Sequence, residues 1–189
     1  MPASGTIVNG IGQPVRRKED LRLLTGKGRF TDDLAPPGLA HAVIVRSPHA
    51  HARIVGMDKR AALAAPGVLA VLAGADYAED GLGLIPHNPG LMATPDVQPR
   101  MRGFAPIATV HCPLPADRVR YVGEPVAIVV AETVALAKDA AELLDVSYEP
   151  LPAVTRATDA LQPEAPRLWE TAPGNLCIDI ELGDEAATA

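Results

Sequence analysis

The segment between Asp80 and Asp117 limits the possible folds most, because it contains eleven glycines and prolines. That many breakers leave no period of 2 or 3.6 residues, so we expect neither a helix nor a long strand in it. A structureless segment of this length is uncommon inside a compact domain, and it is typical of a binding loop, an arm that covers a partner, or a disordered segment. We therefore expect contacts outside this domain to order it.

The chain before this segment shows a strand, helix, strand pattern. A run of β-branched residues predicts a strand over residues 39–47, and a second short strand is expected over 52–58. An alanine-rich helix follows within 59–67. The apolar run at 68–74 then predicts another strand.

The chain after this segment repeats the pattern. The run VAIVVA, residues 126–131, is apolar on both faces, as a central strand would be. Thr133 is a good N-cap for the helix that follows, and residues 145–149 predict the next strand. The helix carries an apolar stripe of four residues, Ala137, Ala140, Ala141 and Leu144. Two such units predict an α+β domain with a mixed sheet.

Both ends of the chain look like extensions of that domain. The leucines at 21–24 predict a short helical turn that Gly26 ends. Prolines keep the chain extended after Pro150, except for a short helical stretch at 157–161. The final run NLCIDIEL offers a late strand, whose partner we expect on another polypeptide or on a further C-terminal part. The expected organisation is an N-terminal extension (1–19), a folded domain (20–150) and an extended linker with a strand (151–189).

Composition and charge exclude several classes of protein. Hydrophobic residues make up 48% of the 189 residues and charged residues 21%, as in an ordinary globular domain. The net charge of −6 leaves no basic surface for a phosphate backbone, so we expect no nucleic-acid partner. The sequence shows no signal-peptide pattern and no apolar run of membrane-spanning length, so a cytoplasmic location without membrane contact is expected. Cys112 and Cys177 form no disulfide framework or metal motif, and we expect both to be reduced.

The motif RSPHAHARI, residues 46–54, places His49 and His51 on one face if the chain is extended there. Two imidazoles in that arrangement can grip a cation, but a metal site needs a third and a fourth ligand. No carboxylate cluster at ligand spacing accompanies the pair, and the other histidines are scattered: His41, His87 and His111. The favoured interpretation is structural hydrogen bonding, with Arg46 and Arg53 paired to carboxylates of a neighbouring domain.

Four segments carry a family resemblance in their order and spacing: RRKEDLRLLTGKGRFTDD, RSPHAHARI, DRVRYVGEPVAIVVAET and AKDAAELLDVSYEPLPAV. From about Gly12 to Asn175 the chain resembles the N-terminal α/β-hammerhead region of a large subunit that binds molybdopterin. That subunit is typical of the xanthine dehydrogenase and carbon monoxide dehydrogenase family, the molybdenum hydroxylases. The resemblance implies an α/β-hammerhead domain with a long irregular central loop.

The resemblance also implies a division of labour. In the family, the large subunit carries a molybdopterin cofactor, often as the cytosine dinucleotide, and oxidises an aldehyde or N-heterocyclic carbon with water as the oxygen source. Electrons leave through a small subunit with [2Fe-2S] clusters and a medium subunit with FAD. The pterin-binding segments and the catalytic glutamate lie in the C-terminal portion of the large subunit, beyond this chain. The resemblance therefore implies a chain that is inactive alone, with no catalytic, cofactor-binding or metal residues of its own.

Two places invite a closer functional interpretation. Glu124 follows a glycine, as the family's catalytic glutamate does, but the surrounding RYVGEPVA resembles the hammerhead strand, so we interpret Glu124 as a bend or interface carboxylate. In family members the region before that strand approaches the funnel that leads to molybdenum. Met101, Arg102 and Phe104 are therefore candidates for a wall of the substrate funnel, with packing on C-terminal domains as the alternative.

Three functions remain open from the sequence. The first is a scaffold and subunit interface within a molybdenum hydroxylase, together with a molybdopterin-binding large chain, a [2Fe-2S] subunit and an FAD subunit. The second is a non-catalytic assembly or adaptor module that keeps the hammerhead fold. The third is a small metal-dependent hydrolase that uses His49 and His51. The breaker-rich segment and the late strand favour the first, because both need a large partner.

Overall fold

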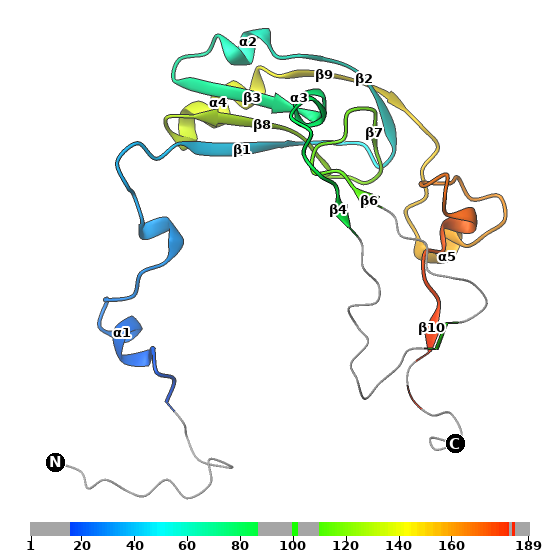
Figure 1. The fold of residues 1–189 in the computed structure, drawn as a ribbon, viewed down its shortest axis with the longest axis horizontal. Helices are drawn as coiled ribbons and strands as arrows, with labels where there is room; N and C mark the ends of the chain where they lie inside the picture. The colour runs from blue at the N-terminus through cyan, green and yellow to red at the C-terminus, as the bar shows by residue number, and fades with distance from the viewer. Residues whose placement is uncertain (1–15, 87–99, 102–109, 182, 184–189) are drawn as a thin grey trace, which may run out of the picture. The chain divides into compact units, whose positions relative to one another are not determined.

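The computed structural model describes residues 16–86, 100–101, 110–181 and 183 (Figure 1). The chain divides into two compact units, Met1–Leu39 and Ala40–Ala189. The described part of the first unit holds a short helix, α1 (Asp20–Leu24), and a 3-10 turn, η1 (Thr31–Asp33). Gly26 follows α1 with a φ of 69°, which glycine adopts at little cost, so the predicted helical turn is confirmed.

Three strands form the first sheet of the second unit, in the order β1 (His41–Arg46), β8 (Pro125–Ala131) and β3 (Val68–Ala73) (Figure 1). The central place of β8 confirms the prediction from its run of apolar residues. One face of this sheet packs on helices α2 (Arg60–Leu63) and α4 (Val134–Glu142), around the buried Val129 and Ala140. This contact forms the first of two small hydrophobic cores.

Helix α4 begins where the sequence predicts. The Thr133 side chain accepts a hydrogen bond from the Leu136 N–H at 3.2 Å, which satisfies one of the free donors of the first turn. Ala137 and Ala140 are fully buried, while Ala141 and Leu144 pack at the edge of the core. The predicted apolar stripe is therefore confirmed for the three alanines, whereas Leu144 lies beyond the end of α4 and packs on the same core.

A second three-stranded sheet is built from β7 (Arg118–Val119), β2 (Ala52–Asp58) and β9 (Asp145–Pro150), in that order. Its inner face buries Ala52 and Val119 against Val126 of β8, with Ile54, Met57 and Tyr148 packed around them. Because Val126 belongs to the first sheet, the second core joins the two sheets.

The expected mixed sheet is not found, although the α+β class is confirmed. All strand pairings among the described residues are antiparallel. The reason is that neither helix returns the chain to the sheet it left. Helix α2 leads from β2 in the second sheet to β3 in the first, and α4 leads from β8 in the first sheet to β9 in the second. A parallel pair needs a crossover within one sheet, and these connections cross between sheets.

The breaker-rich segment contains more pairing than the sequence predicts. Helix α3 (Gly74–Glu79) directly precedes it, and three two-residue strands lie in its described part: β4 (Ile85–Pro86), β5 (Arg100–Met101) and β6 (Val110–His111). β4 pairs with β6, and β5 pairs with β10 (Ile180–Glu181). The expectation that the late strand lacks a partner in this chain is therefore wrong, because two residues between breakers are enough to pair with it.

The C-terminal region has little further regular structure. A short helix, α5 (Ala157–Ala160), confirms the predicted helical stretch, and a 3-10 turn, η3 (Pro173–Asn175), follows. In the described ranges, no helix has the length and apolarity needed to cross a bilayer.

Candidate functional site

The RSPHAHARI loop and the bend before β8 form one hydrogen-bonded junction. Ser47 N–H donates to the carbonyl of Glu124 at 2.9 Å, and Gly123 N–H donates to the carbonyl of Ser47 at 2.8 Å. The Arg46 guanidinium adds a bond from Nη1 to the carbonyl of Gly123 at 2.8 Å. Gly123 has a φ of 89°, a conformation that favours glycine. This junction connects the end of β1 to the start of β8.

A buried carboxylate closes the bend from within. Glu124 is 5% exposed, and its side chain accepts a hydrogen bond from the backbone N–H of Arg120. Burial raises the pKa of Glu124 above its ordinary value of 4.5, against the opposing effect of the Arg120 and Tyr121 backbone donors. The carboxylate thus organises the turn between residues 120 and 124. That geometry fits the interpretation of Glu124 as a bend carboxylate, whose exclusion from catalysis stays a prediction.

Arg120 connects this bend to the C-terminal region. Its guanidinium carbon lies 4.0 Å from the centre of the Trp169 ring, and its Nε donates to the carbonyl of Leu168 at 3.0 Å. The His111 ring also contacts Trp169 in a T-shaped arrangement, with the ring centres 5.9 Å apart. A cation held over an indole is an attractive arrangement because the ring face is electron-rich. Trp169 is therefore the anchor of the segment that follows β9.

The backbone around Trp169 is shaped by one asparagine. Asn175 has a positive φ of 56°, and its side chain accepts from Leu168 N–H at 2.9 Å. Its amide nitrogen donates to the carbonyls of Ala160 and Pro166 at 3.1 and 3.0 Å. Three hydrogen bonds from one side chain thus tie α5, Trp169 and η3 into a single turn.

A cavity of about 200 Å³ lies between the bend and Trp169. Its lining mixes apolar, charged and thiol side chains: Leu84, Cys112, Pro115, Ala116, Asp117, Arg120, Glu124 and Trp169. The Cys112 thiol donates to the carbonyl of Leu114 at 3.1 Å, and both cysteines of the chain are free thiols. The sequence did not predict that Arg120 or Trp169 belongs to a site, although a single tryptophan in a proline-rich stretch is a usable signal of an anchor.

The two histidines of the RSPHAHARI loop make separate contacts. The His49 ring packs on Tyr148, with the ring centres 4.8 Å apart. His51 is 6% exposed, and its Nδ1–H donates to the carbonyl of Pro152 at 2.7 Å. Among the described residues, no group of three His, Cys, Asp or Glu side chains could hold a metal ion. The His51 Nδ1 bond fits the interpretation of structural hydrogen bonding, which stays a prediction for His49.

Both arginines have partners within this chain, and their pairing with carboxylates of a neighbouring domain stays a prediction. Arg46 donates to the Gly123 carbonyl, and Arg53 pairs with Glu149 of the adjacent strand β9 at 3.3 Å. Glu149 lies opposite Arg53 in the β2–β9 register, which the sequence alone does not fix.

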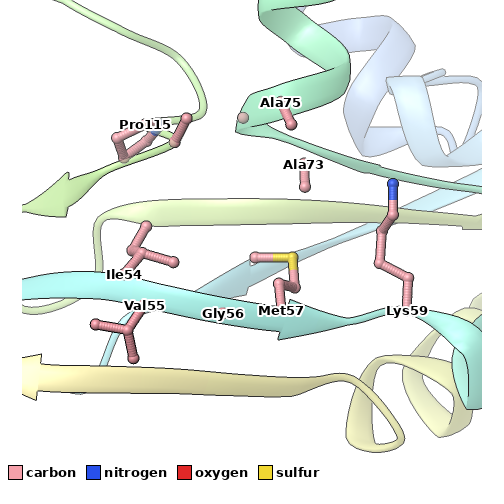
Figure 2. Close-up of a pocket in the computed structure, with 10 residues that line it drawn as sticks. Ile54, Val55, Gly56, Met57, Lys59, Ala73, Ala75 and Pro115 are labelled. Atoms are coloured by element: carbon pink, nitrogen blue, oxygen red, sulfur yellow. The ribbon is translucent and has the colours of Figure 1, made fainter.

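A second cavity, of about 290 Å³, lies between β2 and α3 (Figure 2). Its lining is apolar except for one lysine: Ile54, Val55, Gly56, Met57, Lys59, Ala73, Gly74, Ala75, Pro115 and Ala116. Lys59 Nζ donates to both carboxylate oxygens of Asp76, at 2.9 and 2.7 Å. This contact, and then the Ala73 N–H, lowers the pKa of Asp76 below its ordinary value of 3.8. The lysine charge of this cavity is therefore already neutralised.

The family resemblance implies molybdopterin, a cofactor that carries phosphate. A phosphate-bearing group needs free cationic or backbone donors, and Lys59 and Arg120 are both engaged within the chain. The linings of these two cavities therefore do not fit the cofactor. Of the candidate funnel residues, Met101 lies in β5 opposite Ile180, while Arg102 and Phe104 lie outside the described residues.

Comparison with known proteins identifies the relationship. The sequence model of the family described as "Aldehyde oxidase and xanthine dehydrogenase, a/b hammerhead domain" matches residues 25–152. The chain is 41% identical to the 6-hydroxypseudooxynicotine dehydrogenase complex subunit gamma of Paenarthrobacter nicotinovorans, over 80% of this chain and 18% of that protein. It is 39% identical to the carbon monoxide dehydrogenase large chain of Afipia carboxidovorans, over 86% of this chain and 18% of that protein.

Experimental structures show the same fold. Quinoline 2-oxidoreductase from Pseudomonas putida 86 matches with a TM-score of 0.67 and 44% identity, over 82% of this chain and 18% of that one. The chain thus spans about 18% of the length of these relatives. The predicted α/β-hammerhead domain is confirmed, here as two small antiparallel sheets with short helices. The chain belongs to the aldehyde oxidase and xanthine dehydrogenase family, as its a/b hammerhead domain.

Proposed function

We propose that this chain serves as the hammerhead part of the large subunit of a molybdenum hydroxylase. The observation that carries the proposal is the family match over residues 25–152. Identities of 41% and 39% to a dehydrogenase complex subunit and to a carbon monoxide dehydrogenase large chain support it. In this proposal the chain is scaffold and subunit interface, and the catalytic centre lies on the remaining part of the large subunit.

The internal contacts of the chain suit a scaffold. The Ser47–Glu124 junction connects β1 to β8, and Arg120 fixes Trp169 at the start of the C-terminal region. The charged groups that the structure describes at these points bond within the chain. They rigidify the domain, and we assign no chemical step to them.

The rest of the assembly follows the family by analogy. The complete enzyme would contain molybdopterin on the large subunit, [2Fe-2S] clusters on a small subunit and FAD on a medium subunit. It would oxidise an N-heterocyclic or aldehyde carbon with water as the oxygen source. Support for a heterocyclic substrate comes from relatives named for 6-hydroxypseudooxynicotine and quinoline, while another relative is named for carbon monoxide.

The proposal includes a contribution of Met101, Arg102 and Phe104 to the wall of the substrate funnel. Replacing Phe104 with alanine in the assembled enzyme is expected to change the ratio of kcat/KM values between a bulky heterocycle and a small aldehyde. Phe30→Ala is a matched control, because Phe30 is a 67% exposed phenylalanine of the first unit. An unchanged ratio in the Phe104→Ala enzyme would reject the funnel role.

Genetic removal tests the functional proposal. Cells that make this chain are expected to lose molybdenum-dependent oxidation of one substrate from a panel of quinoline, an aldehyde and carbon monoxide when its coding region is deleted. Re-expression of the chain should restore that activity. If the deleted cells keep every activity of the panel, the chain is not part of such an enzyme. If activity is lost but the purified enzyme lacks the chain, the adaptor alternative holds.

A further inference from the structure

The first sheet has a second face that the helices do not cover. Successive residues of a strand point to opposite faces, so the face opposite α2 and α4 carries every other residue of β1, β8 and β3. Strand alternation also brings Arg46 and Val126 to this side, at the end where the β1–β8 register shifts. The six residues beyond that end are Ala42, Ile44, Ala70, Leu72, Ile128 and Val130, and they are called here the outer face. All six side chains are apolar.

The register aligns these residues into two complete rows across the sheet. Ile44 and Leu72 both lie opposite Ile128, which stands between them on the central strand. Ala42 and Ala70 both lie opposite Val130 in the same way. No charged or polar side chain interrupts either row. An antiparallel sheet that faces water normally alternates apolar and polar faces, so two apolar rows on the second face indicate contact with another surface.

The outer face continues a surface that is already buried. Val126 precedes Ile128 by two residues on the same side of β8, and it is fully buried in the core shared with the second sheet. Ile128 and Val130 are only partly covered, and the flanking Ile44 and Leu72 are 43% and 40% exposed. The second sheet therefore covers one end of this face and leaves the rest open among the described residues.

We propose that the outer face packs against the molybdenum-binding remainder of the large subunit. This inference rests on the proposed function. The length of the relatives indicates which surface covers the outer face. Each relative is more than five times as long as the region that it shares with this chain. The contact is apolar, so the partner surface is expected to be aliphatic and uncharged.

The test compares two leucines with similar exposure. Leu72→Lys places a charge on the outer face, whereas Leu143→Lys changes a 49% exposed leucine at the end of α4, on the helix-covered side. A lysine is favourable near a helix C-terminus, so the control is expected to fold normally. Ile44→Lys serves as a second variant in the same row. Thermal unfolding followed by circular dichroism establishes that each full-length variant is folded.

The measurement is binding of each purified variant to the molybdenum-binding chain of the same assembly. Leu72→Lys and Ile44→Lys are each expected to weaken binding by about tenfold or more, because the lysine charge would have to lose its water in an apolar contact. Leu143→Lys is expected to bind as the unmodified chain does. Hydroxyl-radical footprinting should also show Leu72 and Ile44 protected in the assembly and reactive in the isolated chain.

Three results would overturn the proposal. Equal binding by Leu72→Lys and Leu143→Lys would show that the outer face lies elsewhere in the assembly. Protection of Leu72 in the isolated chain at all concentrations would show that this chain covers its own face, and protection that appears with concentration would show that a second copy does. No binding of the unmodified chain would instead reject the proposed function, and this inference with it.

Discussion

Replacement of Glu124 tests whether the buried carboxylate holds the bend that connects the two sheets. Its side chain accepts a hydrogen bond from the backbone N–H of Arg120 at a position that is 5% exposed. Glu124→Leu keeps the volume roughly the same but leaves the Arg120 N–H without an acceptor. A buried donor without a partner costs about 1–3 kcal/mol. Because leucine also avoids the cost of burying a charge, we expect a net loss of about 2 kcal/mol in the free energy of unfolding.

Glu124→Gln separates the hydrogen bonds from the charge. The amide oxygen still accepts from the bend, so the glutamine variant is expected to lie within about 1 kcal/mol of the unmodified chain at pH 7. Urea unfolding followed by circular dichroism gives both values, provided that the slope with denaturant is unchanged. If Glu124→Leu unfolds at the same urea concentration as Glu124→Gln, the carboxylate does not hold the bend.

The pH dependence of these variants carries a definite sign. Burial raises the pKa of Glu124 in the folded chain above the ordinary 4.5 of the unfolded chain. The folded state therefore binds this proton more tightly, and the stability of the unmodified chain falls as the pH rises from 4.5 through the raised value. Glu124→Gln lacks this loss, so its stability relative to the unmodified chain should increase over the same range. Parallel pH profiles would refute the reasoning.

Three further substitutions test the contacts that shape the domain. Thr133→Ala removes the cap of α4 and is expected to cost about 1 kcal/mol in urea unfolding, while Thr133→Ser should cost less. Trp169→Ala removes the ring beneath Arg120, and it should make the C-terminal region cleavable by trypsin before the rest of the domain unfolds, which full resistance would contradict. Gly74→Ala places a Cβ 2.6 Å from the backbone of Ala116, so it should lower the free energy of unfolding by about 1–3 kcal/mol. Gly83→Ala is the control, because its Cβ meets nothing within 4 Å. Equal losses of stability in the two variants would contradict the expected clash at Gly74.

Local features of this chain could be predicted from its sequence. The run VAIVVA predicts a central strand because every residue in it is apolar, and β8 occupies that place. Thr133 and the alanine stripe predict the start and the buried side of α4, since capping and helical spacing depend on residues close in sequence. The family resemblance then added the hammerhead fold, which local patterns alone do not define.

The pairing of strands that are distant in sequence could not be predicted from local sequence patterns. The direction of pairing depends on which sheet receives the chain after each helix, and here each helix changes sheets. The late strand β10 finds its partner in β5, a two-residue strand between breakers that shows no pattern of its own. Arg120 and Trp169 meet only because β7 and the C-terminal region lie side by side, so their contact has no signature in either segment.

The measurement that tests the account most directly is native mass spectrometry of this chain, purified gently from cells that also make its partner chains. Molybdenum, iron and flavin are determined on the same sample. The account predicts that the chain is held in a complex with a larger molybdenum-bearing polypeptide and with iron–sulfur and FAD subunits. A monomer free of molybdenum, iron and flavin would contradict it and would favour the adaptor module.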